Sequence, residues 1–273
     1  MALTFLFWNL NRKPIQSLVA NLVRRHEVDV LMLAECSISP AALLTSLNPL
    51  EGSTDYDYVP NINHEKIKIF TKFSRKFISL KFENGRLAIG HLKLPGLTDI
   101  LLSVTHFPSK IHWSESSLAA ECNMLSQKIR ELEKEIGHSR TVLVGDLNMN
   151  PFEKGMVNAN GLNGAMARGI AQRKTRTVLE EHYPFFYNPM WSLLGDASPG
   201  PPGTYYYSGS EHTAFFWHMF DQVLIRPDLL ESFRNSDLKI LCSDGEVSFL
   251  SPNGFPNKKI ASDHLPILFK LTL

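Results

Sequence analysis

Apolar and polar residues alternate along the first part of the chain in blocks that predict two strands and a helix. Residues 3–8 form a continuous apolar run, and residues 28–34 (VDVLMLA) form a second, as buried strands do. Between the runs, Pro14 suits a first helical turn, and apolar side chains follow at helical spacing at Ile15, Leu18, Val19, Leu22 and Val23. Two strands joined by a helix predict a parallel pair, and the second strand is apolar enough to be covered on both faces.

Residues 77–144 predict a hairpin, two further strands and a long helix. Residues 77–82 and 87–94 flank Asn84-Gly85, a dipeptide typical of a type I′ hairpin turn. Strands are predicted at 101–105 and 141–144. Between these strands, apolar residues recur at spacings of three and four, so a helix is expected there, with Ser114 suited to cap its start and Gly137 to end it.

The rest of the chain is less regular. Residues 151–219 are expected to form mainly irregular loops, and later strands are predicted at 205–207, 220–225, 238–242 and 265–271. No internal repeat interrupts the pattern, and no linker separates regions of different composition. We therefore expect one domain over residues 1–273.

Composition narrows the class of protein. The chain has 273 residues, a formal net charge of +1 and 44% hydrophobic residues, which excludes a disordered chain and argues against a mainly electrostatic DNA binder. Its cysteines (Cys36, Cys122 and Cys242) contain no CxxC pair and predict neither a disulfide framework nor a zinc site. The N-terminus lacks the basic segment of a signal peptide, and no apolar run approaches the roughly 18 residues of a membrane span. We expect a cytoplasmic protein that acts away from membranes, with no obligate protein partner evident.

Polar residues recur where the predicted strands end or begin. Asn9, Glu35, His106 and Asp146 each follow an apolar run, whereas Asp221 and the pair Asp263-His264 stand at or near strand starts. In layered α/β folds, strand ends lie together at one edge, where loops build binding sites. These separated segments are therefore expected to converge on one cleft.

The residue types in this set favour a particular chemistry. Carboxylates, imidazoles and amides are present without a cysteine among them, and hard oxygen ligands select Mg²⁺ or Mn²⁺ over zinc. Mg²⁺ takes few carboxylates and leaves positions for water and substrate phosphate, while the remaining carboxylate and imidazole groups can transfer protons. The inventory suits hydrolysis of a phosphate ester.

Six motifs in chain order resemble those of the endonuclease/exonuclease/phosphatase superfamily, which has the DNase I-like fold. They are FWNLN (7–11), LMLAE (31–35), THF (105–107), VGDLNMNP (144–151), FDQVLI (220–225) and SDHLPI (262–267). The resemblance spans nearly the whole chain, and the GDxN motif followed by a terminal SDH is its most specific part. It implies a four-layer α/β/β/α sandwich, in which two mixed β-sheets pack face to face with helices outside.

The resemblance also implies a metal site. Glu35 would be the central ligand of Mg²⁺, for which Mn²⁺ could substitute, and Asp263 would assist directly or through water. Asn11 stands where many relatives have an acidic or amide residue near the metal. Asn9 would orient the phosphate or the surroundings of Glu35.

The catalytic roles that the resemblance implies fall on five further residues. Asp146 would hold or deprotonate the attacking water, and Asn148 would bind the same oxygen region. His264 would contact the scissile phosphate, with Asp221 fixing its ring. His106 would donate to a non-bridging oxygen or to the leaving group.

The sequence departs from the family pattern in informative ways. An Ala precedes Glu35, where a Gln is common in relatives, and Asn11 carries no charge. His106 is similar to the DNase I, sphingomyelinase, deadenylase and tyrosyl-DNA phosphodiesterase branches and unlike the abasic-site endonucleases. The lack of paired cysteines argues against a secreted DNase.

Basic and aromatic segments offer candidates for substrate contact. We interpret the lysines and arginines between residues 64 and 86 as a solvated face of edge strands rather than a phosphate-binding footprint. A second basic cluster in the irregular region makes Arg173 and Lys174 candidates for substrate binding. Among the aromatic residues, Trp217 is singled out because it precedes the Asp221 strand at the expected edge of the cleft.

Together these features predict a Mg²⁺-dependent phosphodiesterase, with DNA or RNA as the favoured substrate. A phosphomonoesterase or a lipid- or inositol-phosphate phosphodiesterase of the same fold is the first alternative. A catalytically silent binding module is the second. The sequence leaves the choice between DNA and RNA, and between endo and exo action, open.

Overall fold

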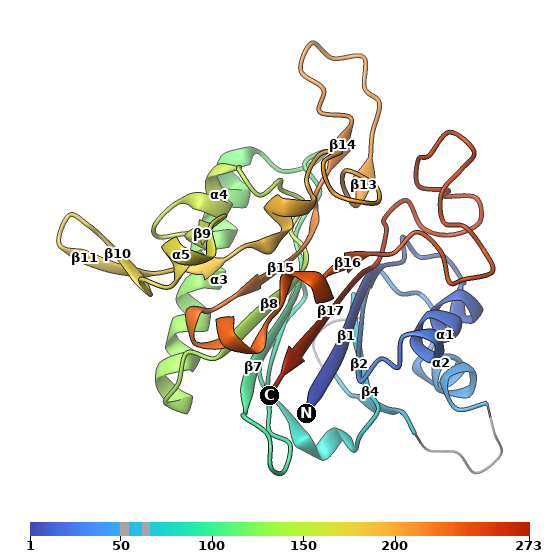
Figure 1. Cartoon of the computed structure of the whole chain (residues 1–273), viewed down its shortest axis with the longest axis horizontal. Helices are drawn as coiled ribbons and strands as arrows, with labels where there is room; N and C mark the ends of the chain where they lie inside the picture. The colour runs from blue at the N-terminus through green and yellow to red at the C-terminus, as the bar shows by residue number, and fades with distance from the viewer. Residues whose placement is uncertain (50–54, 62–65) are drawn as a thin grey trace.

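Two mixed β-sheets pack between two groups of helices (Figure 1). The computed structural model describes residues 1–49, 55–61 and 66–273. One sheet has the order β16-β17-β1-β2-β4-β3, with strands Lys239–Ile240, Ile267–Thr272, Ala2–Asn9, Val30–Ala34, Ile67–Thr71 and Asp57–Val59. The other has the order β5-β6-β7-β8-β15-β12-β9, with strands Ile78–Asn84, Leu87–Leu92, Ile100–His106, Thr141–Asp146, Asp221–Ile225, Phe186–Tyr187 and Gly164–Ala165.

Helices and two small ribbons complete the fold. The helices are α1 (Gln16–Arg25), α2 (Pro40–Leu47), α3 (Glu115–Ile136), α4 (Lys154–Val157) and α5 (Arg168–Ala171), with short 3₁₀ segments at Arg75–Phe77, Pro189–Leu193, Pro227–Ser232 and Asn235–Asp237. One ribbon pairs β10 (Thr175–Val178) with β11 (Glu181–Pro184), and the other pairs β13 (Tyr205–Tyr206) with β14 (Trp217–His218).

Side-chain alternation along the strands creates three apolar layers. In β1, Phe5 and Phe7 face the other sheet, while Leu6 and Trp8 face the side covered by α1 and α2. The second sheet repeats this arrangement, because residues such as Leu143 join the separate core under α3. Alternate residues of a strand point to opposite faces, so a fully apolar strand must be covered on both. The predicted four-layer sandwich is confirmed.

Most of the predicted elements form, with differences that have local causes. β1 and β2 are parallel, and α3 begins after its Ser114 cap and ends at Gly137, which has a φ of 78°. The hairpin between β5 and β6 is present, but its connecting residues are Gly85 and Arg86, and neither has a positive φ. The turn is therefore not the expected type I′, which requires positive φ at both central residues.

Several elements lie outside the predicted set: α2, β3 and β4 in the first part of the chain, and α4, α5, β9, β10, β11, β12 and β14 in the region expected to form mainly irregular loops. α2 is only eight residues long, and β3 is three residues long. β4 is fully buried next to β2, although its sequence, IKIFT, carries a lysine. Short segments show too few periods to be recognised from pattern alone.

The sheet register gathers the polar strand ends at one edge. β7 and β8 are parallel, so His106 is paired with Asp146 at the ends of both strands. β15 runs antiparallel to β8, which brings its first residue, Asp221, opposite Asp146. Within the described part of the chain, no helix is long and apolar enough to cross a membrane.

Candidate functional site

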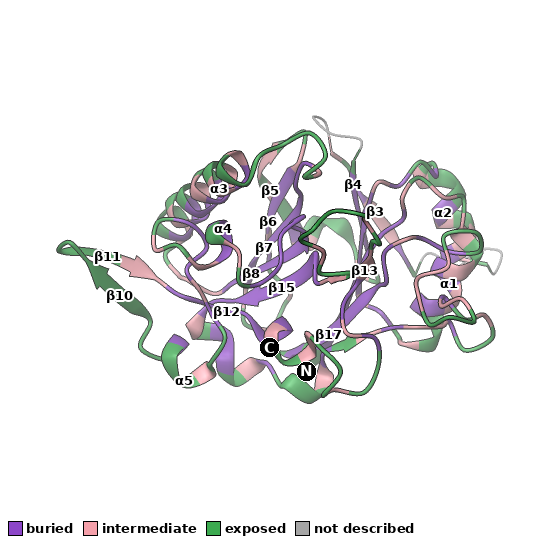
Figure 2. Cartoon of the chain, turned by 90° about the horizontal axis from the view of Figure 1, so that it is seen from above, coloured by how far each residue is buried: buried purple, intermediate pink, exposed green. Residues whose placement is uncertain are grey.

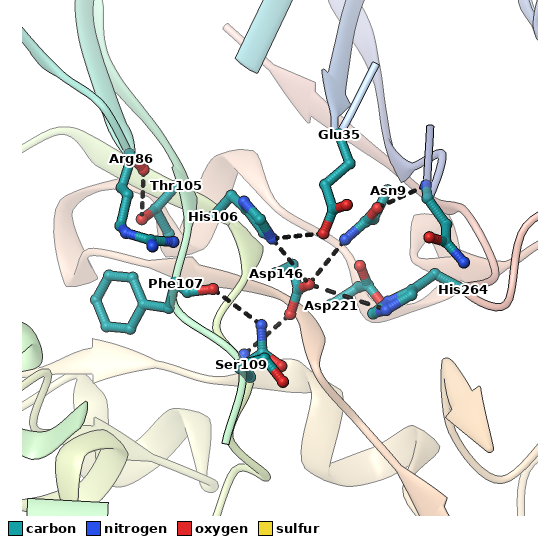
Figure 3. Close-up of polar contacts among 12 residues, drawn as sticks. Asn9, Glu35, Arg86, Thr105, His106, Phe107, Ser109, Asp146, Asp221 and His264 are labelled. Carbon is teal, nitrogen blue, oxygen red and sulfur yellow. Dashed lines mark hydrogen bonds and ion pairs between the residues drawn. The ribbon is translucent and has the colours of Figure 1, made fainter. Parts of the chain in front are cut away.

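Asp146 lies at the centre of the gathered strand ends (Figure 3). Its side chain is almost fully buried. Asn9 Nδ2 donates a hydrogen bond to its Oδ2 at 2.9 Å, and the backbone N–H of Asn148 donates to Oδ1, also at 2.9 Å. His106 Nε2 and His264 Nε2 lie 3.8 and 3.9 Å from the same Oδ2. Donors from both sheets therefore surround one carboxylate.

The turn after Asp146 is shaped to hold this arrangement. Any Cβ at Gly145 would collide with the backbone oxygen of Thr105 on β7, so only glycine allows the two strands to approach so closely there. Asn148 adopts a left-handed φ of 49°, a conformation that asparagine tolerates better than most residues. Its Nδ2 donates to the backbone oxygen of Phe107 at 3.0 Å, which fixes the side chain beside Asp146.

Glu35 faces Asp146 from the end of β2, in the other sheet. His106 Nε2 lies 3.1 Å from Glu35 Oε1, and Arg12 Nε lies 3.6 Å from Oε2. The hydrogen bond from His106, with the charges of His106, Arg12 and His264, outweighs burial and lowers the pKa of Glu35 to about 2. The carboxylate is therefore ionised at neutral pH, and with 25% of its side chain exposed it remains open to solvent.

Lys68 anchors the segment that follows Glu35. It lies on β4, is 9% exposed, and its Nζ donates to the backbone oxygens of Cys36 and Ile38 at 2.8 and 2.6 Å. Glu35 itself has a left-handed φ of 45°, which is an uncommon conformation for glutamate. The sequence interpretation counted Lys68 among solvated lysines, but the structure uses it to hold the chain beside Glu35. The position of Lys68 within an apolar run was the sequence feature that could have indicated its burial.

His264 and Asp221 form a buried pair beside Asp146. His264 Nδ1 lies 2.8 Å from Asp221 Oδ2. Burial alone would lower the pKa of His264, but the carboxylates of Asp221, Asp146 and Asp263 outweigh it and raise that pKa to about 10. The ring is therefore protonated at neutral pH and presents Nε2–H toward Asp146.

The backbone around Asn9 and His264 is tied across the two ends of the chain. Ser262 Oγ donates to the backbone oxygen of Asn9 at 2.7 Å, and Trp8 Nε1 donates to the backbone oxygen of His264 at 2.8 Å. The backbone N–H of Asn11 donates to Asn9 Oδ1 at 2.9 Å, so the first motif orients the amide of Asn9 toward Asp146. Asp263 is half-buried, and Ser262 Oγ lies 3.3 Å from its Oδ1.

The donor set fits a hard divalent cation. Ligand atoms of Asp146, Asp221 and His264 lie within 4.8 Å of one another, but the protonated ring of His264 has no lone pair for a metal ion. The ligands are therefore carboxylate oxygens, and Glu35 adds an ionised carboxylate that faces solvent. Asp221 Oδ1 is buried and finds no hydrogen-bond partner among the residues that the structure describes, which leaves an acceptor free in this region. Oxygen-rich sites of this kind suit Mg²⁺ or Mn²⁺.

Two predicted substrate-binding residues lie away from this site. Lys174 Nζ donates to Asp228 Oδ1 at 2.8 Å, and Asp228 follows the end of β15 opposite to Asp221. Arg173 immediately precedes Lys174, next to the exposed β10–β11 hairpin, which projects from the side of the molecule (Figure 2). The structure therefore does not bring Arg173 and Lys174 together with Glu35, because they lie at the base of the hairpin, beside the end of β15 opposite to Asp221.

Trp217 lies on β14, next to the site but on the far face of its ribbon. It is paired with Tyr206, and its ring packs against Tyr206 and Phe255. The neighbouring residue, His218, is paired with Tyr205, whose ring lies 4.8 Å from that of His264. Because strand side chains alternate between faces, His218 rather than Trp217 shares the face of the catalytic cluster.

A second histidine–carboxylate cluster lies at the opposite end of β7. His91 Nε2 and His138 Nε2 lie 2.8 and 3.2 Å from Asp99 Oδ2. His138 Nδ1 accepts the backbone N–H of Arg140, so its Nε2 carries the proton and donates to Asp99. The Arg140 side chain binds the other carboxylate oxygen. This tautomer and this ion pair make the cluster a set of structural contacts rather than a metal centre.

Comparison with known proteins identifies relatives of this fold. The model of the Endonuclease/Exonuclease/phosphatase family matches residues 6–264. A sequence search of curated proteins found no match. Among solved structures, an endonuclease/exonuclease/phosphatase family protein from Bacteroides thetaiotaomicron is similar with a TM-score of 0.60 and 14% identity, over 99% of this chain and 95% of its own.

Two further solved structures have the same fold. TDP2 of D. rerio, complexed with a single-strand DNA product, has a TM-score of 0.57 and 14% identity, over 100% of this chain and 99% of its own. The endonuclease domain of TRAS1, a telomere-specific non-LTR retrotransposon, has a TM-score of 0.54 and 12% identity, over 100% of this chain and 99% of its own. With a family model matched from the first strand to His264, the chain belongs to the Endonuclease/Exonuclease/phosphatase family.

Proposed function

We propose that the chain is a Mg²⁺-dependent phosphodiesterase that hydrolyses DNA or RNA. The observation that carries the proposal is the convergence on Asp146 of Asn9, Asn148, His106 and the His264–Asp221 pair, with ionised Glu35 opposite. A buried carboxylate among proton donors, beside a solvent-facing carboxylate, supplies both a proton acceptor and a cation ligand. Two similar structures are described as an endonuclease domain and as a complex with single-strand DNA product, which supports a nucleic-acid substrate.

The proposed roles follow from the contacts. Asp146 accepts a proton from the attacking water, and Asn9 and Asn148 hold its two oxygens so that the carboxylate keeps its orientation. His264, protonated and fixed by Asp221, donates from Nε2 to a phosphoryl oxygen. His106 donates from Nε2 to Glu35 in the free chain and is positioned to serve a non-bridging oxygen or the leaving group.

Glu35 is the principal ligand we propose for Mg²⁺, because it is ionised and faces solvent. Asp263 and Asn11 are proposed to complete the surroundings of the ion, directly or through water. Bound Mg²⁺ would neutralise the charge that develops on the phosphoryl group. Lys68 supports the ligand by holding the backbone that follows it.

A substrate panel tests the proposal. Purified protein is incubated with labelled single- and double-stranded DNA and RNA, with Mg²⁺, Mn²⁺ or EDTA, alongside Asp146→Asn and, as a surface control, Lys174→Ala. We expect cleavage that requires the metal and Asp146 and is unaffected by the control. Phosphate release from inositol phosphates without any nucleic-acid cleavage would instead indicate a phosphomonoesterase or a lipid- or inositol-phosphate phosphodiesterase. The absence of any metal-dependent turnover would favour a silent binding module.

A further inference from the structure

A row of aromatic rings extends from the candidate site toward the surface. We call it the aromatic row, and its members are His264, Tyr205, Phe220, His218, Phe215 and Phe152. Successive ring centroids lie 4.8, 5.3, 4.6, 6.0 and 5.5 Å apart in that order. Each ring therefore contacts the next, and the row begins at the histidine proposed to touch the scissile phosphate.

Strand pairing creates the inner part of the row. Tyr205 pairs with His218 in the β13–β14 ribbon and forms an isolated bridge with His264, so the three side chains share one face. Phe220 follows His218 by two residues and leads directly into Asp221 at the start of β15. The row is thus a continuation of the catalytic edge of the sheet rather than part of the three apolar cores.

The outer end of the row is exposed, whereas its inner members are buried or half-buried. Phe220 is 7% exposed, His218 and Tyr205 are half-buried, and Phe152 and Phe215 are 38% and 55% exposed. Apolar surface left open beside a polar site is a frequent mark of ligand binding. The outer rings therefore offer flat faces to a ligand whose other end reaches His264.

Polar groups line the same surface. Lys110 Nζ lies 5.5 Å above the centroid of the Phe220 ring and is paired with Glu153. His218 Nδ1 accepts a hydrogen bond from Asn150 Nδ2 at 3.1 Å, which leaves its Nε2–H as a donor. Burial, with the charge of Lys110, lowers the pKa of His218 to about 4, so the ring is neutral at physiological pH. Flat rings and a neutral donor suit the bases of a nucleotide chain, with Lys110, itself paired with Glu153, beside them.

The loop that carries Phe215 argues against a lipid surface as the occupant. The connection between β13 and β14 projects beyond the edge of the sheets (Figure 1). Its outermost sequence, residues 208–212, reads SGSEH and is polar with an acidic residue. A loop that enters a bilayer would instead carry apolar side chains at its tip, with basic residues beside them. The exposed aromatic residues of the loop, Tyr207, Phe215 and Phe216, lie at its base next to β13 and β14 and not at its tip.

We propose that the aromatic row binds unpaired nucleotides adjoining the phosphate that is cleaved, so that single-stranded DNA or RNA, or the single-stranded end of a duplex, is the preferred substrate. The inference rests on the proposed nuclease function and adds a preference for single-stranded over double-stranded nucleic acid. Unpaired bases can leave their own stack and lie on the rings, whereas bases in a duplex are already stacked and paired.

Binding measured without cleavage tests the inference. Fluorescence anisotropy with EDTA present gives the Kd of the wild-type chain for a labelled oligothymidylate and for a hairpin duplex of the same charge. The variants are Phe215→Ala and Phe152→Ala in the row, with Trp217→Leu as the matched control on the opposite face of the ribbon. Circular dichroism and thermal unfolding verify that each variant is folded. Vesicles of phosphatidylcholine containing phosphatidylserine form a separate arm.

We expect single-strand Kd to rise about tenfold in each row variant, since stacking on one ring is worth roughly 1–3 kcal/mol, with no change for Trp217→Leu. Duplex Kd should change little in any variant. Equal wild-type affinity for single strand and duplex, or unchanged single-strand affinity in both row variants, would overturn the inference while leaving metal-dependent cleavage intact. Loss of vesicle binding in the row variants, with nucleic-acid affinity unchanged, would overturn it in favour of a membrane surface.

Discussion

Asp221 Oδ2 lies 2.8 Å from His264 Nδ1, although the two residues are 43 positions apart in the sequence. Both side chains are buried. The hydrogen bond fixes the imidazole so that Nε2 faces Asp146, and the negative charge of Asp221 keeps the ring protonated despite its burial. The carboxylate thus determines both the direction and the charge of the histidine.

His264→Gln should lower kcat by about 10²–10⁴-fold, because it removes the charged donor to the phosphoryl group. Asp221→Asn should act in the same direction, and the double variant should be no slower than the slower single variant, because the two residues act as one unit. Steady-state kinetics on a labelled oligonucleotide measures this. Asp99→Asn is the matched control, since Asp99 also binds a histidine but at the far end of β7. Additive losses would contradict the paired role.

His264 and His218 should titrate on opposite sides of neutral pH. The pKa values are about 10 for His264, which carboxylates keep charged, and about 4 for His218, which burial keeps neutral. Imidazole NMR signals of the metal-free chain, assigned with His264→Gln and His218→Gln, measure both. Because the folded chain retains a proton on His264 that the unfolded chain loses above its ordinary pKa of 6.5, this group's contribution to the free energy of unfolding is full below pH 6.5 and declines from there to about 10. Signals showing His264 neutral at pH 8 would contradict the account.

Lys68→Met should weaken the response to Mg²⁺. Loss of the two hydrogen bonds to the backbone after Glu35 leaves the ligand less constrained, and the Mg²⁺ concentration for half-maximal activity should rise about tenfold. The free energy of unfolding should also fall by about 1–3 kcal/mol, because two buried acceptors lose their partner. Lys72→Met, at an exposed position one residue beyond β4, is the control. A loss of stability with an unchanged Mg²⁺ response would mean that Lys68 is purely structural.

Arg226→Met should destabilise the fold while Lys174→Met should not. Arg226 is fully buried, its Nε lies 2.8 Å from Glu133 Oε1, and its guanidinium lies over the ring of Phe186. Removing it leaves a buried carboxylate without its partner, which costs about 3–5 kcal/mol. The pair between Lys174 and Asp228 is open to solvent and should contribute nothing measurable. Urea unfolding of both variants compares them, and equal stability would contradict this assignment.

The sequence was sufficient to predict site residues where a polar residue follows a regular apolar strand. β7 and β8 are apolar strands that each end in a polar residue, so His106 and Asp146 could be expected at one edge of the sheet. The same reasoning led to Asn9 and Glu35 at the ends of β1 and β2. Strand pairing brings these four residues close together, as expected for polar residues that follow apolar strands.

The sequence was insufficient to place a side chain where its strand is short or where its interaction partner is distant in the sequence. β14 contains only two residues, so nothing in its pattern indicated that Trp217 faces away from the site while His218 faces toward it. Lys174 forms its ion pair with a residue 54 positions away, which local composition cannot reveal. Lys68 was interpreted as solvated because lysines on both sides of it are frequent, and only the pairing of β4 with β2 makes it buried.

The central claim is that metal-dependent phosphodiester hydrolysis depends on Asp146. The most direct measurement is the initial rate of cleavage of a labelled single-stranded oligonucleotide, for the wild-type chain and Asp146→Asn, with Mg²⁺ and with EDTA. We predict cleavage by the wild type with Mg²⁺, none with EDTA, and a rate at least about 10²-fold lower for Asp146→Asn. Equal rates for the two chains, or wild-type cleavage that persists in EDTA, would contradict the account.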